Sequence, residues 1–175
     1  MSSTNTSDSA TVHQPLPGTE AAIKSDSNAD AHCPGKNFVV LECTAQQVDA
    51  FTCDKSTKPL KNVPVVSAAT ARTDQETNIT HALVINEGSR CGDKPDHSLF
   101  NPNQLQSCGI PAWDNPFDCE WGLPVSPLEH DVTIPLKTKG TKVFFDARAP
   151  TPEESHACVH VNLTSENDWN PMKFS

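Results

Sequence analysis

The sequence predicts a mostly β fold with one short helix, preceded by a disordered leader. Short segments with alternating or β-branched apolar residues recur along the chain, which is typical of strands. The 175 residues include 15 Pro and 7 Gly, and this balance favours short, interrupted elements over long helices. Residues 1–24 are dominated by Ser, Thr, Asn, Ala and Asp, so we expect them to form the disordered leader.

The central part of the chain predicts a strand, a hairpin and the one helix. Residues 37–44 are rich in β-branched side chains and predict the first strand. Residues 63–71 and 79–86 predict a hairpin, because the polar segment 73–78 separates them. Residues 98–107 predict the helix, with Pro102 near its first turn, where a missing N–H is tolerated.

The C-terminal part predicts a second hairpin and a final strand. Residues 132–136 alternate apolar and polar side chains, 137–140 form a turn, and 141–146 run back. Residues 158–164 predict the last extended segment. The expected domains are the leader at 1–24, a β domain at 25–145, and a C-terminal extension at 146–175.

Charge and hydropathy exclude several classes of partner. The formal net charge of −9 would repel phosphate, so direct nucleic-acid binding is not expected. The longest fully apolar run, 38–41, is far shorter than the roughly 20 residues that cross a bilayer. No membrane partner is expected, and the polar N-terminus does not resemble a signal peptide, so we expect a cytoplasmic location.

The cysteines and histidines predict no metal site and no cofactor. There are seven Cys, an odd number, and no two have the Cys-x-x-Cys spacing of a zinc site, so we expect reduced thiols. His156, Cys158 and His160 would share one face of a strand and could hold a metal. We interpret them instead as part of an alternating edge strand with its His side chains in water. Trp113, Trp121 and Trp169 lie in predicted loops, where packed caps are expected rather than ligand platforms.

The segment 26–30, Asp-Ser-Asn-Ala-Asp, has catalytic character, and the chain from it to Pro171 resembles a known family. It looks like the protease-like segment of Copia-type retrotransposon polyproteins, as found in algae, oomycetes and fungi. The resemblance covers about five-sixths of the chain. It rests on separate stretches in a fixed order: 26–30, 35–41, 61–66, 97–105, 114–118, 140–146, 150–154 and 163–171.

This resemblance implies a retropepsin-like fold, a small closed β-barrel that forms half of an aspartic endopeptidase. Two chains then associate as a homodimer, and each contributes one carboxylate to a pair that shares a proton and cleaves a polypeptide. On this basis Asp26 is the expected catalytic residue and Ser27 the hydroxyl that braces the loop across the dimer. Ala29 and Asp30 would contact substrate, the hairpin at 63–86 would cover the cleft, and 99–109 would close the barrel.

Two departures from the family bear on activity. The protease loop has Gly where this chain has Asn28, and Gly both permits unusual dihedrals and lets substrate approach the backbone. The polar pair Lys24-Ser25 also precedes Asp26, where the family has an apolar strand. The sequence therefore predicts a catalytically degenerate remnant of the protease. An active endopeptidase that uses Asp26 from two chains and an unrelated intracellular protein-binding domain remain as alternatives.

Overall fold

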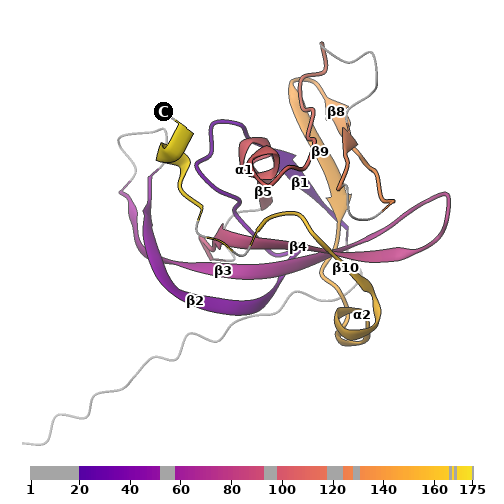
Figure 1. The fold of residues 1–175 in the computed structure, drawn as a ribbon, viewed down its shortest axis with the longest axis horizontal. Coiled ribbons are helices and arrows are strands. Elements are labelled where there is room, and N and C mark those ends of the chain that lie inside the picture. Colours follow the sequence, from indigo (N-terminus) through magenta and orange to yellow (C-terminus); the bar gives the residue numbers. More distant parts are fainter. Residues whose placement is uncertain are drawn as a thin grey trace, which may run out of the picture.

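The computed structural model confirms a mostly β fold (Figure 1). It describes residues 20–51, 58–92, 98–117, 124–127, 131–165, 167 and 169–174. Their strands form two four-stranded sheets and one two-stranded sheet. Figure 1 shows the long strands β2, β3 and β4 as one curved layer, with β1, β5 and α1 grouped on its concave side.

The first sheet carries the candidate loop and has the order β5-β1-β9-β8. Strand β1 pairs in parallel with β5 and antiparallel with β9, so it lies inside the sheet. Ile23 at its centre is fully buried, which explains why residues 21–24 form a strand and not the end of a leader. The strands are β1 (Ala21–Ser25), β5 (Ser98–Phe100), β8 (Lys137–Lys139) and β9 (Lys142–Ala147).

The second sheet has the order β10-β4-β3-β2. Strands β3 and β4 form the predicted hairpin, in which Asn78 takes a positive φ at the turn. The predicted final strand, β10, pairs in parallel with β4, so the C-terminal segment completes this sheet and is not an extension of it. The strands are β2 (Val39–Ala50), β3 (Leu60–Thr73), β4 (Thr80–Ser89) and β10 (Val159–Asn162).

The described chain has more helix than the single segment predicted at 98–107. Residues 98–100 of that segment are strand β5, and helix α1 (Pro102–Ser107) starts at the proline as expected. Helix α2 (Pro152–Ala157) was missed, although Thr151 and Glu154 form a capping box that the sequence already contains. A 3₁₀ helix, η1 (Pro171–Phe174), follows near the C-terminus.

The sheets share one apolar core, but the described strands do not close into a barrel. Both four-stranded sheets have an open order with free edges, so the closure expected from the family is not found among the described residues. A two-residue bridge between Ala71 and Arg148 joins the sheets. The third sheet pairs β6 (Pro124–Val125) with β7 (Ile134–Pro135), and Val125 and Ile134 add their buried side chains to the core.

Candidate functional site

The loop 26–30 begins where β1 and β5 end side by side. The backbone N–H of Asp26 donates to the carbonyl of Phe100 at 3.0 Å, so the parallel pairing continues one residue past β1. The chain then turns, because the Ala29 N–H donates to the Asp26 carbonyl at 3.2 Å. The N–H of Asn28 donates to the Asp26 carboxylate at 3.0 Å. This geometry leaves Asp26 half-buried at the shared end of the two strands.

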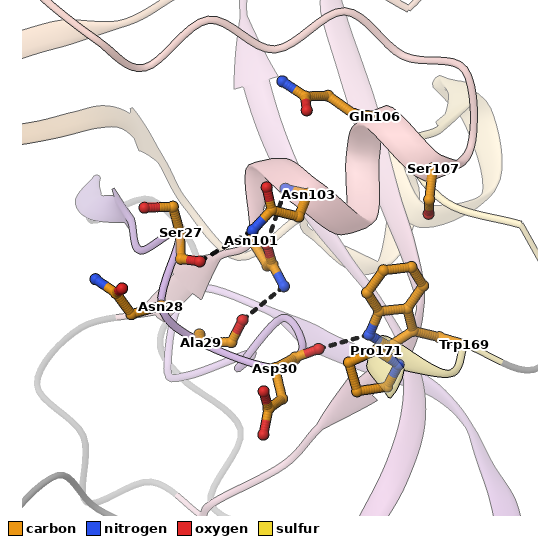
Figure 2. A pocket seen from close by; sticks show the side chains of 10 residues that line it. All are labelled: Ser27, Asn28, Ala29, Asp30, Asn101, Asn103, Gln106, Ser107, Trp169 and Pro171. Carbon is orange, nitrogen blue, oxygen red and sulfur yellow. Dashed lines mark hydrogen bonds between the residues drawn. The ribbon is translucent and has the colours of Figure 1, made fainter. Parts of the chain in front are cut away.

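Helix α1 holds the loop through two asparagine side chains (Figure 2). The Nδ2 of Asn101 donates to the Ala29 carbonyl at 2.7 Å, and the Nδ2 of Asn103 donates to the Ser27 carbonyl at 2.9 Å. Asn101 also caps the helix, because its Oδ1 accepts the N–H of Asn103 at 2.8 Å. The loop conformation is therefore fixed by the start of the helix that follows β5.

A buried histidine supports the other end of the loop. The backbone N–H of His32 donates to the Oε1 of Gln104 at 2.9 Å, and its Nδ1 accepts the N–H of Asn101 at 3.0 Å. An accepting Nδ1 requires the proton to lie on Nε2, which has no hydrogen-bond partner. Burial lowers the pKa of His32 to about 3, so the imidazole is neutral near pH 7.

A pocket of about 510 Å³ lies between the loop, helix α1 and the C-terminal segment (Figure 2). The indole N–H of Trp169 donates to the Asp30 carbonyl at 2.5 Å and joins the C-terminal segment to the loop. Asp30 is the only charged residue among the lining residues, so the pocket presents mainly neutral polar groups. The lining residues are Ser27, Asn28, Ala29, Asp30, Asn101, Asn103, Gln106, Ser107, Trp169 and Pro171.

The structure brings some of the predicted site residues together around this pocket. Ser27, Ala29 and Asp30 line it, and Asp26 lies beside it without lining it. Ser27 and Asp30 are exposed, and Ala29 is half-buried. The carboxylate of Asp114 accepts the hydroxyl of Ser25 at 2.6 Å. Aspartic protease chemistry needs two carboxylates in contact, and one chain supplies a single Asp26 to such a pair.

Asn28 occupies an ordinary backbone conformation. The described non-glycine residues with a positive φ are Asn62, Asn78 and Glu87, so Asn28 does not occupy the left-handed region. Its side chain is exposed at the pocket. The fold therefore accommodates asparagine here. The consequence of this residue is that its side chain occupies space in front of the loop.

Two expectations concern the surroundings of the site. The hairpin at 63–86 is expected to cover the cleft that two chains would form. In one chain none of its residues lines the pocket, and its turn lies at the far end of the sheet (Figure 1). The tryptophans were expected to pack as caps. Trp169 does border the pocket, but Trp113 is 61% exposed. Trp121 lies outside the described residues.

Several residues at the pocket are marked by no local sequence pattern. Gln106, Ser107 and Pro171 have no signal of their own, because their roles depend on contacts across the fold. Asn101 does have a local sequence signal, because an asparagine directly before Pro102 is a typical helix cap. Its second role, holding the loop 72 positions away, could not be inferred from a local pattern.

The described residues contain no group of three or more His, Cys, Asp or Glu side chains that could hold a metal ion. His160 of the predicted edge strand instead contacts the Ser155 carbonyl through Nε2 at 2.9 Å. Within the same part of the chain, every helix is too short or too polar to span a lipid bilayer.

Comparison with known proteins adds no identity to this geometry. No protein-family model, no curated protein and no solved structure matches the chain. The loop, the helix that holds it and the pocket beside them are therefore the features from which a function can be inferred.

Proposed function

We propose that this chain is a protease-like domain of a Copia-type retrotransposon polyprotein, a catalytically degenerate relative of homodimeric aspartic endopeptidases. The observation that carries the proposal is the position of Asp26. Asp26 directly follows β1, and its backbone N–H donates a hydrogen bond to the carbonyl of Phe100 at the end of β5. Helix α1 holds its loop through hydrogen bonds. An aspartic protease half-site needs one carboxylate presented in this way, on a loop with little freedom to move.

A retropepsin-like mechanism would need a second copy of the chain. Two carboxylates in hydrogen-bond contact cannot both ionise, so they share one proton, and one activates water while the other protonates the peptide carbonyl. Since each chain has one Asp26, a twofold dimer would supply the pair. Ser27 would brace the two loops against each other, and Ala29 and Asp30 would contact an extended polypeptide substrate.

Asn28 is the reason for proposing a degenerate site. Its backbone is unstrained, so the loop does not need glycine to fold. Its exposed side chain stands at the pocket, where glycine would leave space for substrate to approach the backbone. A side chain at this point would displace the peptide from Asp26, and small displacements of reacting groups reduce rates by orders of magnitude.

Restoring the glycine tests the proposal. Asn28→Gly, the parent chain and the double variant Asp26→Asn/Asn28→Gly would be incubated with labelled, unstructured casein between pH 4 and 7. We expect the parent to be inert and Asn28→Gly to cleave, with specific activity that rises with protein concentration as dimers form. The double variant should be inert, because it has the same loop without the carboxylate.

The other outcomes decide between the alternatives. A parent that cleaves while the double variant does not would establish an active endopeptidase and reject the degenerate site. An Asn28→Gly variant that is folded and dimeric by sedimentation, yet inert, would remove the support for a protease relationship. Thermal unfolding of each variant serves as the folding control, so a loss of activity is not confused with a loss of structure.

A further inference from the structure

Two cysteines from distant parts of the sequence meet behind the candidate loop. The side chains of Cys33 and Cys91 lie close enough to interact there. The flanking chains run side by side, since the Ser89 N–H donates to the His32 carbonyl at 2.8 Å. Pro34 also lies against Gly88, where an added Cβ would come within 3.0 Å of the proline ring. The segments 32–34 and 88–91 are thus held next to each other by contacts that do not involve sulfur.

The surroundings give the two sulfurs different chemistry. Interaction with the thiol and then with the backbone of Cys91 lowers the pKa of Cys33 to about 7. The same interaction between the two side chains, together with burial, raises the pKa of Cys91, which therefore keeps its proton. Both residues are half-buried, so a small reagent can reach them.

We propose that Cys33 and Cys91 form a two-cysteine redox site that closes to an intramolecular disulfide in exchange with a low-molecular-weight disulfide such as glutathione disulfide. The Cys33 thiolate attacks one glutathione sulfur, breaks the S–S bond and releases one glutathione thiolate. Cys91 then loses its proton, attacks the Cys33 sulfur of the mixed disulfide and releases the second glutathione. Two protein thiols are oxidised, one glutathione disulfide is reduced to two thiols, and the protein loses two hydrogens.

The disulfide would covalently join two chain segments next to the candidate site. It would join the segment after the loop 26–30 to the segment after β4 and close a loop of about 60 residues that contains β2, β3 and β4. His32, which fixes the loop through Asn101 and Gln104, is the immediate neighbour of Cys33. This inference does not depend on the proposed protease relationship.

Other described cysteines provide the comparison. Cys43 is exposed on β2, and the sulfur of Cys108 accepts the Ser165 N–H at 3.2 Å. Cys43→Ser is therefore a matched control, because it removes an accessible thiol without touching the pair.

The test is disulfide mapping of the native protein in glutathione buffers of increasing oxidation. After alkylation and digestion, we expect one internal cross-link, between the peptides that contain Cys33 and Cys91. We also expect the melting temperature to rise by about 5–10 °C, the order expected for a loop of this length. Cys43→Ser should behave as the parent, and Cys33→Ser and Cys91→Ser should form only mixed disulfides with glutathione.

Disulfide mapping of the native protein, without any variant, is sufficient to overturn the proposal. If excess glutathione disulfide yields no Cys33–Cys91 peptide, or yields it no more often than other pairings, the redox site does not exist. Because the mapping does not measure proteolysis, this failure is independent of the outcome for Asn28→Gly.

Discussion

His32 connects the chain that follows the candidate loop to the start of helix α1. Its backbone N–H and its Nδ1 each bond to a different residue at the start of the helix, and the whole side chain is buried. A buried neutral imidazole with one unpartnered N–H has a cost, which the fold offsets with two hydrogen bonds that set the path of the chain after the loop. This residue type gives no indication in the sequence of whether it is buried or exposed.

The lowered pKa of His32 predicts a loss of stability in mild acid. Between the ordinary pKa of 6.5 and the folded value of about 3, the unfolded chain binds a proton that the native chain does not. Stability therefore falls as the pH decreases through this window, by about 2 kcal/mol between pH 7 and 5. His32→Asn retains an acceptor for the Asn101 N–H but cannot titrate, so its unfolding free energy should lose this component.

Urea denaturation at pH 7 and 5 measures the difference. His156→Asn, at an exposed position of α2, is the matched control and should show the parent's pH dependence. Equal losses of stability in the parent and in His32→Asn would contradict the assignment of a buried neutral imidazole.

The residues of the loop could be predicted from the sequence, and their partners could not. Asp26, Ser27, Ala29 and Asp30 are near neighbours in the chain, so one turn suffices to bring them together. Asn101 and Trp169 reach the loop only because two sheets fold around a common core. Contacts across 72 and 139 positions leave no local pattern, which explains why the pocket was not foreseen.

At the scale of single elements, the predicted hairpin at 132–146 is found in part. Its return strand is β9, and Gly140 takes a φ of 62° at the turn, but residues 137–139 of the predicted turn form strand β8, which pairs with β9. Residues 134–135 of the predicted first strand form β7, which pairs with β6. Residues 98–100 are a strand and not part of the predicted helix, because they pair in parallel with β1, which lies far away in the sequence. Helix α2 differs, since the capping box of Thr151 and Glu154 is a local signal that the sequence contains.

The capping box of α2 predicts a measurable loss for Glu154→Gln. The Glu154 carboxylate accepts two guanidinium N–H groups of Arg148, each at 2.6 Å, and the Thr151 N–H at 2.9 Å. These bonds, with Arg148 as the main cause, lower the pKa of Glu154 to about 2. With about a fifth of both side chains exposed, we expect a destabilisation of about 1–2 kcal/mol at pH 7.

The sign of the pH dependence distinguishes this ion pair from a packing effect. The stabilisation is complete above the ordinary pKa of 4.5 and is lost as the pH falls toward 2, so the parent and Glu154→Gln should converge in acid. Glu153→Gln, at the neighbouring exposed position, is the control and should differ from the parent by less than about 0.5 kcal/mol. A gap between the parent and Glu154→Gln that persists unchanged at low pH would contradict the prediction.

At the scale of the molecule, the C-terminal segment is part of the core. The sequence analysis predicts a domain boundary at residue 145, with 146–175 as a C-terminal extension. The structure instead buries Ala147, Ala149, Val161 and Leu163 from this segment. Strand β10 covers the free edge of β4, and the Arg148 backbone bridges the two sheets at Ala71. Parallel pairing between elements so far apart could not be inferred from hydropathy alone.

A chain that ends at residue 145 should therefore fail to fold cooperatively. It loses four buried apolar side chains and the pairing of β10 with β4, and it exposes Leu83 and Val84, which β10 covers at the sheet edge. Burial of one large aliphatic side chain contributes about 1.5–3 kcal/mol, and whole domains are stable by only about 5–15 kcal/mol.

The matched control ends at Asn170, keeps Trp169 against Asp30, and removes η1. By thermal circular dichroism we expect a cooperative transition for the control, within a few degrees of the full chain, and none for the shorter chain. A cooperative transition for the chain that ends at residue 145 would support the boundary predicted there and would make the C-terminal segment a separable addition to the loop and its helix.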